Sequence, residues 1–298
     1  MTTLAASIPD ALFDPRLGRR RLAGTIFLGA CVAAIGLLMI ALVLLLFDVL
    51  GRGIPWLSVD FLTGVPSRRP HSAGILPALV GSIELGLIVG GLTFPIGVAA
   101  AIYLHEYAAD TRLNRLLQTN IANLAGVPSI IYGIFGLALF VRVLALGESL
   151  IAGALTMVLL ILPIVIIASI EALRAVPNSQ REGAYALGAT RWQMVRDTVL
   201  PAAAPGLLTG IILAMARAIG EAAPLILVGA VTFVTFLPAP FQEGYTVLPI
   251  QVFSWAQRPQ DDFQGIAAAT IIVVLAVMLL LNGLALLLRA RLSRNSQW

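Results

Sequence analysis

The sequence predicts an all-α membrane protein with six transmembrane helices and both termini in the cytoplasm. Three observations support this prediction. Hydrophobic residues make up 59% of the 298 residues and charged residues only 11%, whereas soluble domains have about 45–50% and about 25%. Six apolar runs are each long enough to cross a bilayer, which takes about 20 residues. Most of the arginines flank these runs on one side.

The six apolar runs follow one another along the chain. They cover residues 22–47, 75–104, 121–141, 150–170, 207–228 and 266–288. The first run is longer than the core of a signal peptide, which has about 7–15 residues, so it is expected to remain as an anchor. Every run is expected to be helical, because hydrocarbon offers no hydrogen-bond partner to an open backbone.

The distribution of the arginines predicts the orientation. Thirteen of them lie before the first run or after the second, fourth and sixth, which places them all on one side: Arg16, Arg19, Arg20, Arg21, Arg112, Arg115, Arg174, Arg181, Arg191, Arg196, Arg289, Arg291 and Arg294. The positive-inside rule puts this side in the cytoplasm. A seventh span over 222–241 would carry the C-terminal arginines outside. Residues 232–262 are therefore expected to be external, with a break at Pro238-Ala-Pro240 and Trp255 as an interfacial anchor.

The chain is expected to divide into an appended anchor and a compact helical unit. Residues 1–21 form a cytoplasmic tail, and residues 22–74 an anchor helix with an external loop rich in Gly, Pro and Ser. Residues 75–288 form the transmembrane domain, which includes a cytoplasmic loop over about 171–206, and residues 289–298 form the C-terminal tail.

The absence of lysine excludes several functions. A chain without lysine has no GxxxxGK[ST] phosphate loop and is not itself an ATPase of that type. Schiff-base chemistry is excluded for the same reason. The single cysteine, Cys31, and the two histidines, His71 and His105, form neither CxxC nor HExxH. We expect a protein that is not an enzyme and has no catalytic residue, cofactor or metal.

The cytoplasmic loop over 171–206 carries the strongest pattern. Asn178 or Ser179 can cap a helix, and Glu182 stands at capping-box distance from Ser179. Gly188 lies where the chain can turn between two short helices. Several apolar residues are expected as anchors and three arginines as solvated side chains: Tyr185, Leu187, Trp192, Met194 and Val195, and Arg181, Arg191 and Arg196.

The same loop resembles the EAA loop of ABC importer permeases. The stretch Glu182-Gly-Ala-Tyr-Ala-Leu-Gly188 is followed by nine residues and Thr198-Val-Leu-Pro201. Gly183 and Thr198 depart from the usual Ala and Ile. In that family the loop is a coupling helix that docks in a cleft of the ATPase subunit. The resemblance implies that the ATPase is contacted by Glu182, Ala184, Gly188, Arg191 and Trp192.

Three ionisable residues stand inside the apolar runs. Arg217 and Glu221 are four residues apart, which places them on one face of a continuous helix, and Glu84 is the third. Ionised groups at membrane depth cost about 2.5–3.5 kcal/mol each, so they normally have partners or a function. Two interpretations remain open: an Arg217–Glu221 pair that neutralises itself, or a translocation pathway in which Arg217 contacts an anion.

Further segments resemble the PstA-type permeases of bacterial phosphate-specific (Pst) ABC importers. They include Ala216-Arg-Ala-Ile-Gly-Glu-Ala-Ala-Pro-Leu225 and Gly126-Val-Pro-Ser-Ile-Ile-Tyr-Gly133. The resemblance implies the type I importer (MetI-like) fold, with one anchor helix and a five-helix core, in the bacterial inner membrane. It also implies transport of inorganic phosphate with a second permease as heterodimer partner, two ATP-binding subunits and an external phosphate-binding protein. No nucleic-acid partner is expected.

Two other functions compete with that of a phosphate importer permease. A proton-coupled secondary carrier could use Glu84, Arg217 and Glu221 as an ion relay, but a carrier has no ATPase to dock with an EAA-like loop. An ABC importer for another oxyanion, such as phosphonate, sulfate or molybdate, is the more serious alternative, because the preference for phosphate rests on the resemblance.

Overall fold

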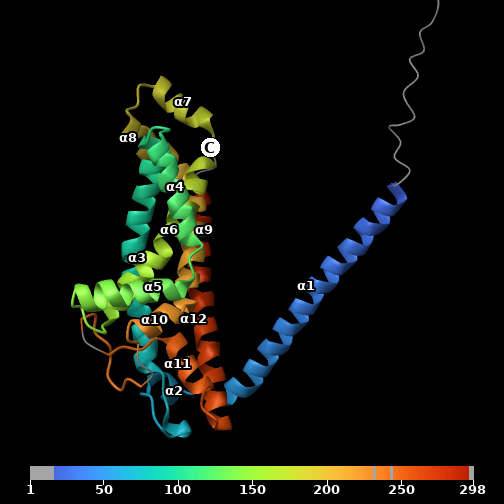
Figure 1. Cartoon of the computed structure of the whole chain (residues 1–298), viewed down its shortest axis with the longest axis vertical. Coiled ribbons are helices and arrows are strands. Elements are labelled where there is room, and N and C mark those ends of the chain that lie inside the picture. The colour runs from blue at the N-terminus through green and yellow to red at the C-terminus, as the bar shows by residue number, and fades with distance from the viewer. Residues whose placement is uncertain (1–16, 231–232, 242–243, 295–298) are drawn as a thin grey trace, which may run out of the picture. The chain divides into compact units, whose positions relative to one another are not determined.

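The computed structural model describes residues 17–230, 233–241 and 244–294, and it is helical with no β-strand in these ranges. The longer helices are α1 (Leu17–Gly53), α3 (Leu76–Ile102), α4 (Arg112–Ala125), α5 (Ser129–Gly136), α6 (Leu150–Arg174), α9 (Leu200–Gly220) and α12 (Asp261–Arg294). The shorter ones are α2 (Val59–Thr63), α7 (Asn178–Ala186), α8 (Arg191–Gln193), α10 (Ala223–Leu227) and α11 (Leu248–Ala256) (Figure 1). The all-α class predicted from the sequence is confirmed.

Within the described ranges, five helices are long and apolar enough to cross a membrane, and the expected span over 121–141 is not among them. That stretch is divided between α4 and a second helical segment, Ser129–Val143, and the two are bent by 100°. Pro128 causes the break, because its ring removes a backbone donor and holds Val127 away from helical geometry. The number of spans is therefore five, or six if the bent pair counts as one.

The chain divides into two units, residues 1–51 and 52–298. In the first unit, the side chains of residues 20–48 are exposed except for the half-buried Cys31 and Gly36. Residues 22–47 of α1 are apolar around the whole circumference of the helix, which is typical of a segment covered by lipid.

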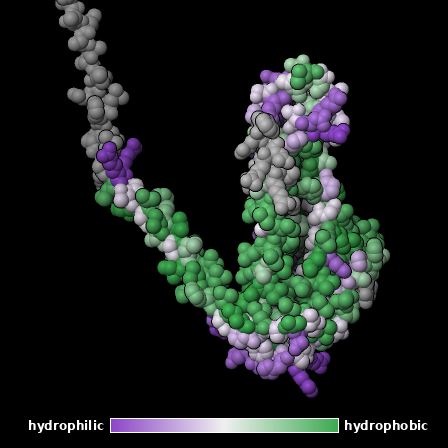
Figure 2. All heavy atoms as spheres, turned by 180° about the vertical axis from the view of Figure 1, so that it is seen from behind, coloured by the Kyte–Doolittle hydropathy of each residue, from purple (hydrophilic) through white to green (hydrophobic). Residues whose placement is uncertain are grey.

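The second unit is built around α6, which is buried on most of its circumference. Leu150, Met157, Ile161 and Leu173 of α6 are fully buried, and α3, α4, α5 and α9 pack around this helix. On the face drawn in Figure 2, hydrophobic residues gather over the middle of the unit and hydrophilic residues lie at its two ends. A membrane-spanning protein has this distribution, because only its ends meet water and lipid headgroups.

Residues 54–75 pack at one end of the second unit, against α11 and α12. Phe61 and Ile75 are buried there together with Trp255 and Phe263. Trp255 is only 1% exposed, and its ring lies 6.3 Å from that of Phe61. The expectation of an interfacial anchor was therefore wrong, because α11 turns this side chain into a local core. No helix runs through residues 233–241, which contain the Pro238-Ala-Pro240 turn.

Candidate functional site

Two breaks in long helices meet at one junction inside the second unit. The first separates α4 from α5 at residues 126–128, and the second separates α9 from α10 at residues 221–222. The hydroxyl of Ser129 donates a 2.9 Å hydrogen bond to Oε1 of Glu221. A Cβ atom placed on Gly133 would lie 2.8 Å from Cα of Pro224. The segments 126–133 and 216–225, singled out separately in the sequence, therefore form a single structural element (Figure 1).

The break after α9 changes the expected relation between Arg217 and Glu221. The helix ends at Gly220, and Glu221 has an extended backbone with φ −87° and ψ 119°. Pro224 explains the break, because its ring would clash with the carbonyl four residues earlier in a continuous helix. Arg217 is exposed, and no ion pair joins it to Glu221 in the described part of the chain. The self-neutralising pair considered from the sequence is therefore not formed.

Glu84 lies on α3 and is separate from this junction. Its side chain is half-buried, and one carboxylate oxygen, Oε2, is buried without a hydrogen-bond partner among the described residues. A buried polar atom with no partner carries a desolvation cost. The three ionisable residues of the apolar runs are thus not gathered into one cluster of ion pairs.

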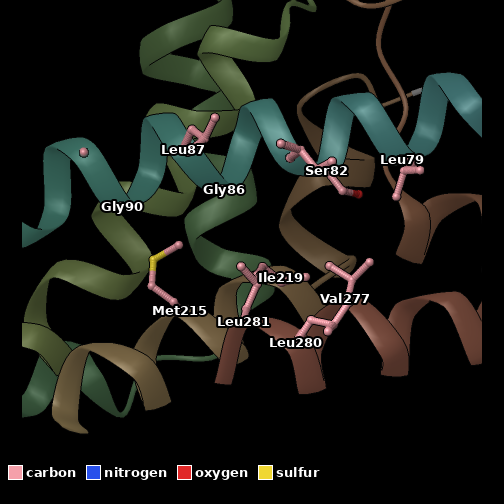
Figure 3. Close-up of a pocket in the computed structure, with 12 residues that line it drawn as sticks. Leu79, Ser82, Gly86, Leu87, Gly90, Met215, Ile219, Val277, Leu280 and Leu281 are labelled. Atoms are coloured by element: carbon pink, nitrogen blue, oxygen red, sulfur yellow. The ribbon is translucent and has the colours of Figure 1, made fainter. Parts of the chain in front are cut away.

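A groove lies between α3, α9 and α12 and has a volume of about 660 Å³ (Figure 3). Leu79 of α3 points toward the side of the groove that Val277 and Leu280 of α12 form, and no ionisable residue is among those that line it. An anion entering a medium of low dielectric constant needs positive charge or hydrogen-bond donors. This groove suits hydrocarbon and lacks the groups that an anion requires.

The loop between α6 and α9 folds into two short helices that turn at Gly188. The backbone of Gly188 has φ +81°, which L-residues with a side chain rarely adopt. The predicted turn between two helices is confirmed. The capping box is formed by Thr190 and Gln193 of α8 and not by Ser179 and Glu182. Because α7 begins at Asn178, Ser179 lies inside the first turn, where its hydroxyl cannot cap the helix.

The exposed surface of this loop combines apolar and polar side chains. Leu187 is 91% exposed and Trp192 is 56% exposed, and Glu182 and Tyr185 are exposed as well. Ala184 is half-buried, and the guanidinium of Arg191 lies 5.1 Å from the centre of the Tyr107 ring. Of the expected apolar anchors, only two are buried, Met194 and Val195. They pack the segment just before α9 against Ile170 and Leu173 of α6, while Leu187 and Trp192 at the tip of the loop remain exposed.

An ion pair that the sequence did not reveal fixes α7 to the end of α3. Nη2 of Arg181 lies 2.8 Å from Oε1 of Glu106, and these side chains are 13% and 6% exposed. The guanidinium also donates to the carbonyl oxygens of Leu173 and Val176 at 2.8 and 2.7 Å. Arg181 was expected to be solvated, and this was wrong. The two residues are too far apart in the chain for any helical spacing to signal their contact.

A family model described as "Binding-protein-dependent transport system inner membrane component" matches residues 93–294, more than half of the chain. The chain is 35% identical over 286 residues to "Phosphate transport system permease protein PstA 1" of Mycobacterium tuberculosis (strain CDC 1551 / Oshkosh), covering 91% of each chain. It is 35% identical over 241 residues to "Phosphate transport system permease protein PstA" of Haemophilus influenzae, covering 80% of this chain and 83% of the relative.

Solved structures of ABC transporters show the same fold. An inward-facing structure of the methionine transporter MetNI matches with a TM-score of 0.58 and 20% identity, covering 74% of this chain and 95% of that one. A bacterial alginate transporter matches with a TM-score of 0.63 and 13% identity, covering 91% and 96%. The resemblance seen in the EAA-like loop and in the segments 126–133 and 216–225 is thereby confirmed. The chain belongs to the binding-protein-dependent transport system inner membrane components, which are membrane subunits of ABC transporters.

Proposed function

We propose that this chain is a permease subunit of an ATP-driven importer for inorganic phosphate. The observation that carries the proposal is the junction between segments 126–133 and 216–225, because the two stretches that resemble phosphate permeases meet through Ser129 and Glu221. The names of the relatives from M. tuberculosis and H. influenzae support the substrate. The chain forms half of a translocation pathway with a second permease, and two ATP-binding subunits and an external phosphate-binding protein complete the complex.

The topology that fits this function has six spans, with the α4–α5 pair counted as one. Both termini lie in the cytoplasm, and the membrane is the bacterial inner membrane. The arginines support this orientation, because Arg112, Arg174 and Arg191 lie toward the end of the second unit that carries α7 and α8. The tails 1–21 and 289–298, the anchor 22–74 and the transmembrane domain 75–288 keep the bounds predicted from the sequence.

The pathway in this proposal includes Arg217, Glu221 and Glu84. Arg217 offers an exposed guanidinium one turn before the α9 break, and such a group binds phosphate through charge-assisted hydrogen bonds. Glu221 is held on Ser129 and leaves this guanidinium without an ion pair in the described chain. The unpaired oxygen of Glu84 gains a partner when α3 moves relative to its neighbours.

Coupling to the ATPase takes place through the exposed loop. Glu182, Ala184, Gly188, Arg191 and Trp192 are the contact residues, and the exposure of Trp192 and the neighbouring Leu187 supports this assignment. The buried Arg181–Glu106 pair supplies the rigidity that coupling needs, because a movement of α7 is passed on to the end of α3.

The proposal is tested by ATP-dependent uptake of radiolabelled phosphate into proteoliposomes that contain the complete complex. We expect Arg217→Gln and Gly188→Asp to abolish uptake while assembly is retained. Arg142→Gln removes another exposed arginine, outside both the pathway and the loop, and serves as the matched control with normal uptake. Normal uptake by the Gly188→Asp variant would remove the coupling assignment.

The same experiment separates the alternatives. Uptake driven by a proton gradient without ATP would show a secondary carrier. ATP-driven uptake of sulfate, molybdate or a phosphonate in preference to phosphate would keep the importer and replace its substrate.

A further inference from the structure

Helix α4 carries a polar face that remains exposed in the structure. This α4 polar face consists of Arg112, Arg115, Thr119, Asn120 and Asn123, all of which are exposed. Arg112, Arg115, Thr119 and Asn123 recur at intervals of three or four residues, so they follow one side of the helix, on which Leu116 is the exposed apolar residue. A different side of α4 packs against α6 through Gln118 and Ile121.

The α4 polar face extends into the depth of the helical bundle. Ile121 lies beside Ile166 and Ile170 of α6, one to two turns inside the end of α6 marked by Arg174. The 14 residues of α4 span about 21 Å, so Asn123 lies deeper still. The outward faces of the other long helices carry leucine at comparable positions, as with Leu87, Leu213 and Leu280.

Lipid does not explain this face. Thr119 Oγ1 and Asn120 Nδ2 each donate a 2.8 Å hydrogen bond to a carbonyl of their own helix. The Asn123 amide has no such partner in the described chain, and an amide left in hydrocarbon costs several kcal/mol.

We propose that the α4 polar face lines an aqueous inner half of the pathway and guides the anion from the Ser129–Glu221 junction to the cytoplasm. This inference rests on the proposed function. The face ends three residues before the break at 126–128, so it is continuous with the junction. No acidic residue stands on α4, and the nearest, Asp110, pairs with Arg115 at 3.2 Å. The amide donors of Asn120 and Asn123, with arginine at the outer end, suit a dianion that must bind weakly and leave.

Cysteine labelling tests this inference in the complete complex. Cys31 is the single cysteine of this chain, so Cys31→Ser provides a version of the chain without thiols, and labelling is read on this chain after its separation from the other subunits. In it, Thr119→Cys and Asn123→Cys are compared with Leu117→Cys, a 46% exposed position on another side of α4. We expect a negatively charged methanethiosulfonate to react at positions 119 and 123 at least about tenfold faster than at 117, because only a wetted thiol ionises and reacts readily. Added phosphate is expected to slow both reactions.

The outcomes separate this inference from the proposed function. Wild-type phosphate uptake with positions 119 and 123 unreactive, with and without ATP, would overturn the inference alone. Labelling that occurs in the isolated chain and disappears on assembly with the second permease would also overturn it, because the face would then be a subunit contact. Labelling of both positions without any phosphate uptake would support a wetted face and remove the proposed substrate. Size-exclusion chromatography of each variant complex confirms assembly before labelling.

Discussion

The guanidinium of Arg181 in α7 and the carboxylate of Glu106 at the end of α3 form a buried ion pair at 2.8 Å. Two main-chain carbonyls at the end of α6 and in the turn after it accept further hydrogen bonds from the same guanidinium. One side chain thus ties α7 to the neighbouring end of α6 and to Glu106, which is 75 residues away in the sequence. This contact anchors the base of the exposed loop to the helical bundle.

Removal of one partner of this pair is expected to be strongly destabilising. Glu106→Ala leaves a buried guanidinium without its counter-ion, which costs about 3–5 kcal/mol. Thermal unfolding of the detergent-solubilised protein measures the effect. Asp197→Ala is the matched control, because its carboxylate lies 3.7 Å from Arg196 and both side chains are mostly exposed. Equal melting temperatures for Glu106→Ala and Asp197→Ala would contradict the structural role.

Substitution of Gly188 is expected to change the stability of this chain through the backbone. No atom lies within 4 Å of a Cβ placed on it, but φ +81° makes a side chain unfavourable by about 1–2 kcal/mol. Gly188→Ala is therefore expected to lower stability. Gly183→Ala is the comparison, because Gly183 lies inside α7 with equally open space and gains about 0.5–1 kcal/mol of helix stability. Melting temperatures that shift in the same direction for both variants would be inconsistent with this account.

Substitution of Gly133 is expected to force apart the α5–α10 junction. A methyl group there meets the main chain of Pro224, which cannot rotate away, so Gly133→Ala costs about 1–3 kcal/mol. Gly86→Ala is the control, because no atom lies within 4 Å of its Cβ position. Thermal unfolding and phosphate uptake are both measured. A Gly133→Ala variant that keeps wild-type stability would show that the junction is looser than the structure indicates.

The hydrogen bond between Ser129 and Glu221 is expected to hold the two helix breaks together. Ser129→Ala removes a hydrogen bond to a carboxylate, a change worth about 1.5–3 kcal/mol. Ser129→Thr keeps the hydroxyl and is expected to stay near wild type. Uptake of radiolabelled phosphate and thermal unfolding provide the measurements. The prediction fails if the Ala and Thr variants behave alike.

The helical class and the family were predictable because they depend on local patterns. Apolar runs mark helices, and the spacing from Glu182 to Pro201 is preserved in a loop whose turn at Gly188 was expected. The bend at Pro128 was missed because hydropathy is continuous across 121–141 and does not register a change of direction. The charge distribution assigned Arg112 and Arg115 to a cytoplasmic loop before the third run. They were therefore not placed on the same helix as Asn123, and the polar face of α4 was missed.

The contacts between distant residues were not predictable from one sequence. Glu106 stands beside His105 with nothing to indicate a partner in α7, and the Ser129–Glu221 bond links two helix breaks that were not foreseen. Tryptophan is a residue type common at membrane interfaces, which favoured that position for Trp255. Only the packing of Phe61 against Trp255 shows that this side chain is buried. Such contacts arise from tertiary packing, which local propensity does not encode.

The bend between α4 and α5 has a consequence for how the protein enters its membrane. The bend places two helix ends, whose outermost main-chain groups lack partners within their own helix, inside one apolar stretch, and α4 adds its polar side chains to the cost of inserting it. Such a segment is expected to insert poorly into the membrane when it leaves the translocon alone. We therefore expect the α4–α5 pair to leave the translocon together with α6, so that biogenesis proceeds by helix pairs and not by single helices.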